Sequence, residues 1–202
     1  MQSKEASQRI KKLYNHANIP EDYWYVGPSQ IKDEMEYKSK LMDYYDNIRD
    51  RVQNGDSVFF YGPLGTGKSA CACMLLKKAL ANGIMGFYTP TFMLQEYSIK
   101  ETKFDKTITM MERCKTVPLL VIDELQLKKN KKWVYEILDD LIRYRIGHKL
   151  ATIICSNYDA EELREFQVKN DHGDLENPLE GFTDVCKQTF EVIKVKGQRF
   201  RK

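Results

Sequence analysis

The chain has 202 residues and a mass of 23.7 kDa, which is enough for one ordinary α/β domain with a short appendage. Its 42% hydrophobic and 30% charged residues can build a core, which excludes a disordered tail. A formal net charge of +3 excludes a histone-like protein whose partner follows from bulk charge alone. No run of about 18 apolar residues is present and the first residues lack the apolar segment of a secretory signal, so we expect a soluble, cytoplasmic protein without a membrane partner.

The first 55 residues are polar and favour helices. A short helix is expected through Ile10 and Leu13, followed by a turn-rich stretch at 18–28. A second helix is expected to end at Asn54-Gly55, because apolar residues precede that stop signal near the helical period: Ile31, Met35, Leu41, Tyr45, Ile48 and Val52. We therefore expect a short N-terminal helical arm, residues 1–55, before a core domain at 56–202.

From residue 56 onward the pattern alternates between strands and helices. Apolar runs predict strands at 57–61, 85–89, 119–122, 151–155 and 190–195. Helical periodicity predicts helices at 68–81, at 91–116 with a polar break near 100–105, and at 131–145. Strands that alternate with such helices form βαβ units, so the sequence predicts an α/β fold with a five-stranded, mostly parallel sheet between helices.

The strongest motif lies between the strand at 57–61 and the helix at 68–81. It reads Gly-Pro-Leu-Gly-Thr-Gly-Lys-Ser and fits the P-loop pattern G-x-x-x-x-G-K-[ST]. Glycines let backbone N–H groups turn inward around phosphate oxygens, and the N-terminus of the following helix favours the same negative charge. Lys68 is expected to reach the β- and γ-phosphates and the Ser69 hydroxyl to ligate Mg²⁺. The sequence therefore predicts a nucleoside triphosphate site formed by Gly62, Pro63, Leu64, Gly65, Thr66, Gly67, Lys68 and Ser69.

Two further strands end in polar residues that suit triphosphate hydrolysis. The strand at 119–122 delivers Asp123 where a P-loop protein holds Mg²⁺, and Glu124 is placed to activate the attacking water as a general base. An acidic pair can also belong to a helix N-cap, but its position 54–55 residues after Ser69 favours catalysis. Asn157 follows the strand at 151–155 and is expected to hydrogen-bond the γ-phosphate or the water, although Ser-Asn after a strand is otherwise a common turn.

In this order the motifs resemble those of an AAA+ ATPase, and in particular of the DnaC/DnaI-type replicative helicase loaders and the IstB-like ATPases. The similar segments are GPLGTGKS, LLVIDEL, LIRYR at 141–145, TIICSNY at 152–158 and GQRFR at 197–201. The resemblance also matches Arg145 to the arginine that closes the long helix before the sensor strand. It implies a site for ATP and Mg²⁺ in which Lys68 and Ser69 are the P-loop pair and Asp123 and Glu124 position the magnesium ion and the water. The resemblance also implies that Asn157 is the sensor 1 residue and Arg201 the sensor 2 residue.

The same resemblance implies an enzyme that binds and hydrolyses ATP and forms homo-oligomers with ATP. It would load a ring-shaped replicative helicase on single-stranded DNA, in the replication of a phage, plasmid or other mobile element. Two alternatives stay open: an IstB-like transposition ATPase that acts on duplex DNA, and an ATP-dependent adaptor with little hydrolysis. Family loaders carry a separate N-terminal domain that grips the helicase, so the arm at 1–55 is expected to be a minimal grip unless the core itself holds the partner.

The sequence departs from the family pattern near its C-terminal end. Family members carry an Asp-Arg pair whose arginine acts on a neighbouring subunit, whereas here Asp184 is followed by Val185 and the nearest cation is Lys187. A lysine lacks the planar two-pronged donor geometry of arginine. We therefore expect slow intrinsic ATPase activity.

Two basic clusters stand out against the near-neutral total. Lysines follow the Asp123-Glu124 strand directly, and five cations lie within 194–202, whereas 159–180 holds eight acidic and two basic residues. A run of charges is usually a solvated face; the alternative is sequence-independent contact with the backbone phosphates of single-stranded DNA. The candidate DNA contacts are Lys128, Lys129, Lys131 and Lys132.

Overall fold

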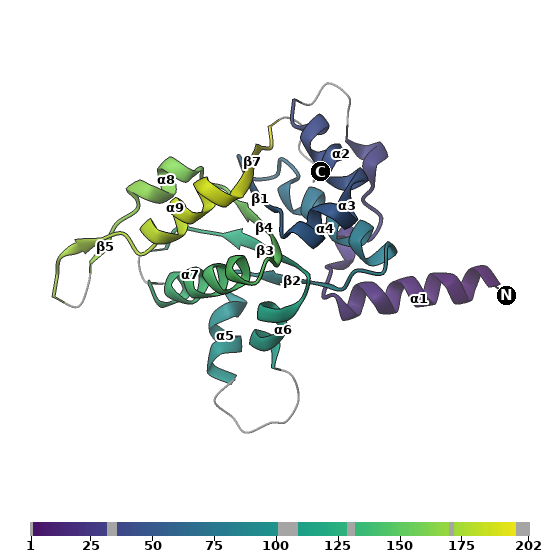
Figure 1. Cartoon of the computed structure of the whole chain (residues 1–202), viewed down its shortest axis with the longest axis horizontal. Coiled ribbons are helices and arrows are strands. Elements are labelled where there is room, and N and C mark those ends of the chain that lie inside the picture. Colours follow the sequence, from purple (N-terminus) through teal and green to yellow (C-terminus); the bar gives the residue numbers. More distant parts are fainter. Residues whose placement is uncertain (1, 32–35, 101–108, 129–131, 170–171, 197–202) are drawn as a thin grey trace.

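The computed structural model describes residues 2–31, 36–100, 109–128, 132–169 and 172–196 (Figure 1). The strand–helix alternation expected after residue 56 is confirmed. The elements in chain order are α1 (Gln2–His16), η1 (Glu21–Tyr23), η2 (Pro28–Gln30), α2 (Lys38–Asp46), α3 (Ile48–Asn54), β1 (Ser57–Tyr61), α4 (Lys68–Ala81), β2 (Gly86–Pro90), α5 (Met93–Lys100), α6 (Met110–Thr116), β3 (Leu119–Leu125), α7 (Lys132–Gly147), β4 (Ala151–Ser156), α8 (Ala160–Glu165), β5 (Val168–Lys169), β6 (Leu175–Glu176), α9 (Glu180–Thr189) and β7 (Phe190–Lys194).

The central sheet has the strand order β2-β3-β4-β1-β7, and every neighbouring pair is parallel. The strands β1 to β4 are short apolar runs that are almost wholly buried, which is the pattern of a parallel sheet covered by helices on both faces. In the edge strand β7 only Phe190 and Ile193 are buried. The predicted α/β fold with a five-stranded sheet is confirmed. Because all strands run in one direction, their carboxyl ends meet at one end of the sheet, where the P-loop leaves β1.

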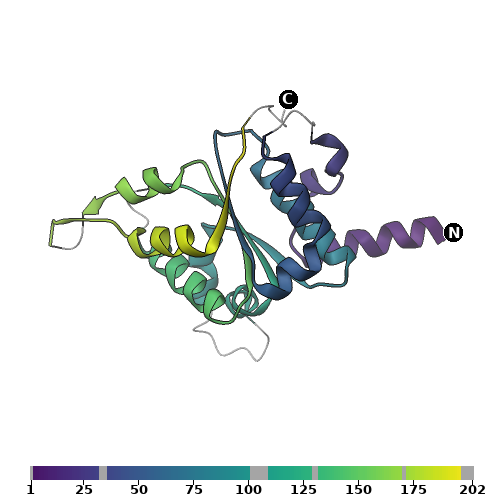
Figure 2. The same ribbon diagram turned by 45° about the horizontal axis from the view of Figure 1, so that its top comes forward.

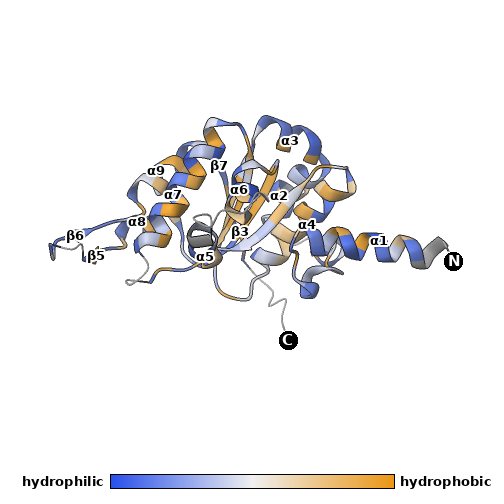
Figure 3. Ribbon diagram, turned by 90° about the horizontal axis from the view of Figure 1, so that it is seen from below, coloured by the Kyte–Doolittle hydropathy of each residue, from blue (hydrophilic) through white to orange (hydrophobic). Residues whose placement is uncertain are grey.

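Alternate residues of each strand enter two different apolar clusters. In β1, Val58 and Phe60 pack in the cluster shared with α2, α3 and α4, whereas Phe59 packs in the cluster shared with α5, α6, α7 and α9. In β3, Val121 enters the first cluster and Ile122 the second. This period-2 alternation builds three layers, with the apolar strands between two sets of helices (Figures 2 and 3).

The N-terminal helices differ from the prediction. The single helix expected to end at residue 54 is two helices, α2 and α3, because the backbone of Asn47 (φ −98°, ψ 23°) leaves the helical region. The Asn47 side-chain amide donates to the Asp43 carbonyl at 3.0 Å, a local bond that competes with helix continuation. The expected end is confirmed, since Gly55 closes α3 at φ +78°. Of the apolar residues expected in this helix, Ile31 lies outside any helix and Met35 lies outside the described residues. The buried side chains of α2 and α3 are Leu41, Tyr44, Ile48 and Val52.

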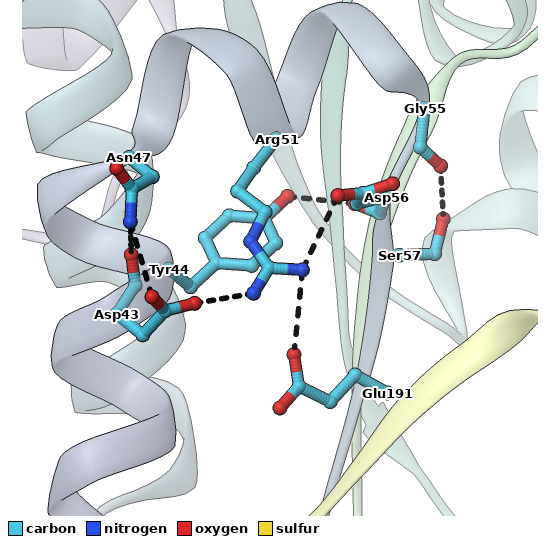
Figure 4. A network of polar contacts seen from close by, with 8 residues as sticks. All are labelled: Asp43, Tyr44, Asn47, Arg51, Gly55, Asp56, Ser57 and Glu191. Atoms are coloured by element: carbon cyan, nitrogen blue, oxygen red, sulfur yellow. Dashed lines mark hydrogen bonds and ion pairs between the residues drawn. The ribbon is translucent and has the colours of Figure 1, made fainter.

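Polar contacts tie these helices to the start of β1 and to β7 (Figure 4). Arg51 of α3 pairs with Asp43 of α2, and also with Asp56 at 3.3 Å and with Glu191 of β7 at 3.8 Å. The Tyr44 hydroxyl donates to the Asp56 carbonyl at 2.7 Å. Since α2 and α3 also share an apolar cluster with the sheet, they pack as part of one body; the domain boundary expected at residue 55 stays a prediction.

The segment between β4 and β7 forms elements that the sequence reasoning did not anticipate: α8, the β5–β6 hairpin and α9. The Asp159 carboxylate accepts the N–H groups of Glu161 and Glu162 at 3.0 and 2.9 Å, so a capping box begins α8. Phe182 of α9 is fully buried in the second apolar cluster. The hairpin strands have two residues each, too few for an alternation pattern to be read from sequence.

Helix α1 leaves the body of the molecule beside β2 (Figure 1). Its apolar residues Ile10 and Leu13 are 49% and 39% exposed, whereas Tyr14 packs against the core and the His16 carbonyl accepts a hydrogen bond from Arg113 at the C-terminal end of the helix. Across the described ranges, no helix combines the length and the apolarity that crossing a bilayer requires.

Candidate active site

The P-loop crosses the carboxyl end of the sheet from β1 to α4, as the sequence predicts. Three of its glycines have positive φ: Gly62 (+143°), Gly65 (+82°) and Gly67 (+99°). A Cβ on Gly62 would lie 2.3 Å from the carbonyl oxygen of Val195, so no other residue fits there without moving the strand end. Gly67 is the N-cap of α4, whose first N–H groups therefore face the loop.

Lys68 closes the P-loop on itself. Its ammonium group donates to the carbonyls of Gly62 and Pro63 at 2.7 and 2.8 Å, and its side chain is buried. Burial lowers the pKa of Lys68, while the nearby Asp123 carboxylate favours the charged form. An ammonium has three N–H donors, and phosphate oxygens are stronger acceptors than these two carbonyls. Lys68 is therefore held where bound phosphate can compete for its donors.

The remaining P-loop residues divide into buried and exposed positions. Thr66 is buried and donates its hydroxyl to the Pro63 carbonyl at 2.9 Å, which braces the loop. Leu64 is 82% exposed at the tip. Ser69 is half-buried in the first turn of α4, at the end of the sheet where β3 also delivers its acidic pair.

Asp123 is buried near the end of β3 with both carboxylate oxygens engaged. Its Oδ1 accepts the backbone N–H of Glu124 at 2.8 Å, and its Oδ2 accepts the Tyr88 hydroxyl of β2 at 2.7 Å. Thr91 donates both its N–H and its hydroxyl to the Asp123 carbonyl, at 2.8 and 2.9 Å. These contacts fix the carboxylate in one orientation, and each oxygen keeps acceptor capacity for a metal or its water.

Glu124 occupies a bulge in β3. The register with β4 shifts between Ile122 and Leu125, and Glu124 has φ +58°, in the left-handed region. For a residue with a Cβ this conformation costs on the order of 1–3 kcal/mol, and such strain concentrates at functional sites. The bulge turns the Glu124 side chain out of the sheet into solvent.

A pocket of about 240 Å³ adjoins this glutamate at the ends of β2 and β3 and the start of α7. Its wall carries an exposed aromatic ring, Phe92, and a cation, Lys128. It lies on the side of Glu124 that faces α7 rather than the P-loop strand. The lining residues are Thr91, Phe92, Glu124, Gln126, Lys128, Val134 and Tyr135.

Asn157 follows the last residue of β4 and is exposed. Because β4 lies between β3 and β1, Asn157 leaves the sheet between the acidic pair and the P-loop. The preceding Ser156 stabilises this turn, since its hydroxyl donates to the Leu125 carbonyl at 3.4 Å and accepts the Tyr158 N–H at 3.0 Å. The strand order thus brings together the three predicted groups of the site.

The other predicted site residues have different outcomes. Arg201, Lys129 and Lys131 lie outside the described residues. Lys128 is exposed beside the pocket, whereas Lys132 forms ion pairs with Glu176 at 2.5 Å and Glu136 at 3.7 Å. The two described lysines of this cluster are therefore not equivalent: one reaches solvent, and the other joins α7 to the β5–β6 hairpin.

Arg145 lies at the opposite end of the sheet from the P-loop. Its guanidinium is fully buried and donates to Thr152 Oγ1 at 2.9 Å. It also donates to backbone carbonyls at the end of α6, just before β3 and at the start of β4. Burial lowers its pKa to about 9, which still leaves the group charged at neutral pH. This arginine is a structural clamp, and the accepting carbonyls belong to Cys114, Lys115, Val117 and Ala151, at 2.8, 3.3, 3.0 and 2.6 Å.

The donors at the carboxyl end of the sheet fit ATP with Mg²⁺. A hydroxyl from Ser69 and a carboxylate from Asp123 are the hard oxygen ligands that Mg²⁺ prefers. The glycine-rich loop and the N-terminus of α4 suit a triphosphate. Sequence reasoning missed Tyr88 and Thr91, which hold Asp123. Tyr88 lies in β2 and Thr91 directly follows it, and the only signal in the sequence was that this predicted strand precedes β3 in the chain.

The parallel strand order, the P-loop after β1 and the acidic pair in β3 define an AAA+ P-loop fold of the ATP-binding class. The family model of the IstB-like ATP binding proteins matches residues 4–202. The chain therefore belongs to the IstB-like ATP binding protein family.

Solved structures with the same fold include helicase loaders and a replication initiator. The chain is similar to DnaI (TM-score 0.69, 15% identity, 91% of this chain and 94% of that chain) and to the DnaC helicase loader (TM-score 0.70, 20% identity, 88% and 100%). It also resembles the replication initiator DnaA bound to AMPPCP and single-stranded DNA (TM-score 0.61, 15% identity, 86% and 50%). No curated protein sequence matches the chain.

Proposed function

We propose that this protein hydrolyses ATP to load a ring-shaped replicative helicase on single-stranded DNA. The observation that carries the proposal is the arrangement of Lys68, Asp123 and Glu124 on adjacent parts of one sheet end. The overall shape supports the loader role, because the chain spans the whole length of a DnaC helicase loader structure.

In the proposed reaction, Lys68 exchanges the carbonyls of Gly62 and Pro63 for the oxygens of the β- and γ-phosphates. Glu124 accepts the proton of the attacking water, and its exposed, bulged position gives that water access. Asn157 donates its amide N–H to the γ-phosphate or accepts a hydrogen bond from the water. The products are ADP and phosphate.

Ser69 and Asp123 would hold Mg²⁺ in this site. When bound there, Mg²⁺ would supply positive charge against the phosphates of the nucleotide. Tyr88 and the Glu124 N–H hold the Asp123 carboxylate in one orientation, and burial excludes bulk water from it.

We expect the hydrolysis to be slow in an isolated chain. The family pattern has an arginine that acts on a neighbouring subunit directly after an aspartate, whereas here Val185 follows Asp184, and the nearest cation, Lys187, is exposed in the last turn of α9. An arginine in that role contributes about 10³–10⁵ in rate, and a lysine offers only a point charge. ATPase turnover measured at rising protein concentration tests this point; a steep rise that disappears in Lys187→Ala would show that the lysine acts across an ATP-dependent homo-oligomer.

The proposed partners contact two different regions. Single-stranded DNA is expected at Lys128, beside the pocket that adjoins Glu124, with Lys129, Lys131 and Lys132 as neighbours in sequence. The helicase is expected at α1, since Ile10 and Leu13 form an exposed apolar pair on a mostly polar helix.

Co-purification with the host replicative helicase, with and without ATP, tests the loader function. We expect ATP-dependent retention of the helicase, lost in the double variant Ile10→Glu/Leu13→Glu. The matched control is Leu175→Glu, which changes an even more exposed apolar residue in the β5–β6 hairpin, far from α1 (Figure 2). Failure of the unaltered chain to retain the helicase in either nucleotide state would contradict the proposal.

An IstB-like transposition ATPase is the second candidate, and the match of the family model to residues 4–202 favours it. The two functions differ in the DNA they need. Fluorescence anisotropy with single-stranded and duplex DNA of the same length separates them, since tighter binding of duplex would support the transposition role. A chain that binds ATP and the helicase with negligible turnover would instead be an ATP-dependent adaptor.

A further inference from the structure

Tyr88 has contacts with two parts of the chain that are distant in sequence. It lies in β2, which pairs with β3 on one side only. On the other side its N–H donates to the Ala17 carbonyl at 2.9 Å, and its carbonyl accepts the Asn18 side-chain amide at 2.9 Å. Its hydroxyl reaches across the sheet end to Asp123 Oδ2 at 2.7 Å. One residue thus joins the segment after α1 to the predicted metal ligand.

The segment after α1, residues 17–26, is itself held firmly. Asn18 has φ +57°, and the Trp24 indole N–H donates to the Ile19 carbonyl at 2.9 Å. The buried ammonium of Lys77 in α4 donates to the carbonyls of Tyr23, Trp24 and Val26. These contacts make the segment a rigid connection between α1 and the strand that holds Asp123.

The C-terminal end of α1 is fixed at the same place. Arg113 of α6 donates to the His16 carbonyl at 2.6 Å and lies 4.5 Å from the centre of the Phe87 ring in β2. A change in the angle of α1 therefore acts directly on β2 at the two residues Phe87 and Tyr88.

We propose that Tyr88 is a positioning residue for Asp123, and that it connects the N-terminal segment at Ala17 and Asn18 to Mg²⁺ binding at the nucleotide site. The inference rests on the proposed ATP and Mg²⁺ site. It adds a route by which a partner on α1 alters the affinity of that site for Mg²⁺–nucleotide. The coupling is reciprocal, so bound Mg²⁺–nucleotide also biases the position of α1.

The contact between Tyr88 and Asp123 favours a positioning role over the alternative that it only gives the buried Tyr88 hydroxyl a hydrogen-bond partner. The Tyr88 side chain is buried, and its phenol O–H has the carboxylate oxygen of Asp123 as its acceptor at 2.7 Å. Asp123 accepts one bond on each oxygen, and the other donor is a backbone N–H that no side-chain change removes. Partners that orient a metal-binding side chain typically contribute 10-fold to 100-fold in metal affinity.

Nucleotide binding measured against Mg²⁺ concentration tests the positioning role. The full chain is titrated with a fluorescent ATP analogue over a series of Mg²⁺ concentrations, for the unaltered protein, Tyr88→Phe and Tyr44→Phe. Tyr44→Phe is the matched control, because it also removes one buried hydroxyl bond, at the other end of the sheet. The Mg²⁺ midpoint is the Mg²⁺ concentration that gives half of the Mg²⁺-dependent nucleotide binding. We expect it to rise about 10-fold or more in Tyr88→Phe only. In EDTA, all three proteins should bind the nucleotide analogue with equal affinity.

Asn18→Gly tests the connection to the N-terminal segment, since glycine keeps the left-handed backbone and removes the amide. We expect a raised Mg²⁺ midpoint in Asn18→Gly and no further rise when it is added to Tyr88→Phe, as for two residues on one path. Unchanged midpoints in Tyr88→Phe, or additive effects in the double variant, would overturn the inference alone. Nucleotide binding by the unaltered chain that ignores Mg²⁺ would overturn the proposed site as well.

Discussion

Lys68 and Arg145 are both buried cations surrounded by backbone carbonyls, at opposite ends of the same sheet. Among the residues that the structure describes, Lys68 hydrogen-bonds to its own loop, whose tip residue Leu64 is 82% exposed. Arg145 joins three separate segments, the end of α6, the start of β3 and the start of β4, through its whole guanidinium. The burial of a charge is therefore not by itself a sign of function.

Lys68 and Arg145 differ in whether a ligand can replace their hydrogen-bond acceptors. The acceptors of Lys68 belong to a glycine-rich loop open to solvent, where phosphate can replace them. The acceptors of Arg145 belong to packed strand ends that would be left without donors if the guanidinium moved. The carboxyl end of the sheet is thus built for ligand exchange, and the amino end for stability.

The largest effect is expected at the carboxyl end, from Glu124→Gln. The amide keeps the shape of the side chain and cannot accept a proton, so ATP turnover should fall about 10²-fold to 10⁴-fold. ATP affinity should stay within about threefold, because Glu124 is exposed and bonds to no phosphate-binding residue in the described structure. Steady-state turnover and analogue binding are measured together, with the exposed α8 variant Glu161→Gln as control. Equal losses of turnover in both variants would contradict the assignment.

At the amino end, Arg145→Met should reduce stability and leave nucleotide affinity unchanged. Several buried carbonyls lose their donor at about 1–3 kcal/mol each, so the free energy of unfolding should fall by on the order of 3–5 kcal/mol. Urea denaturation measures the change, and Arg145→Lys provides a milder variant should the first fail to fold. If Arg145→Met retained full stability, its five contacts would not be a structural clamp.

The smallest effect concerns DNA at the ends of β3 and α7. Lys128→Ala should make single-stranded DNA affinity less sensitive to salt. The slope of the logarithm of the binding constant against the logarithm of the salt concentration should become less steep by about 0.7. Lys132→Ala should change the slope less, because its ammonium group is already paired with Glu176 and Glu136. Fluorescence anisotropy at several salt concentrations measures both slopes. Equal slopes for the two variants would mean that the ion pairs of Lys132 open when DNA binds.

Local patterns predicted most of the fold and the position of the P-loop between β1 and α4. The helix expected at 68–81 is α4 with the same bounds, because the P-loop glycines start it and Asn82-Gly83 ends it. Four of the five sheet strands were found because each is a short, mostly apolar run, whereas β7 mixes apolar and charged residues. Such signals depend on neighbouring residues only, so a single sequence carries them.

Features set by distant contacts could not be predicted. The bulge that gives Glu124 its positive φ depends on the register of β3 against β4. The contact between Tyr88 and Asp123 joins residues 35 positions apart, and the pairing of Lys132 with Glu176 requires a hairpin that no pattern indicated. Arg145 was matched to the family by sequence alone, and only the surrounding carbonyls reveal its structural role.

The contrast between the two buried cations is tested most directly by one titration. A fluorescent ATP analogue is added, in Mg²⁺, to the unaltered chain, to Lys68→Met and to Arg145→Lys. Two hydrogen bonds to a charged group contribute about 1.5–3 kcal/mol each, so Lys68→Met should weaken binding about 100-fold or more, while Arg145→Lys binds like the unaltered chain. Saturable binding of equal strength by Lys68→Met would contradict the account, because Lys68 would then be one more structural cation.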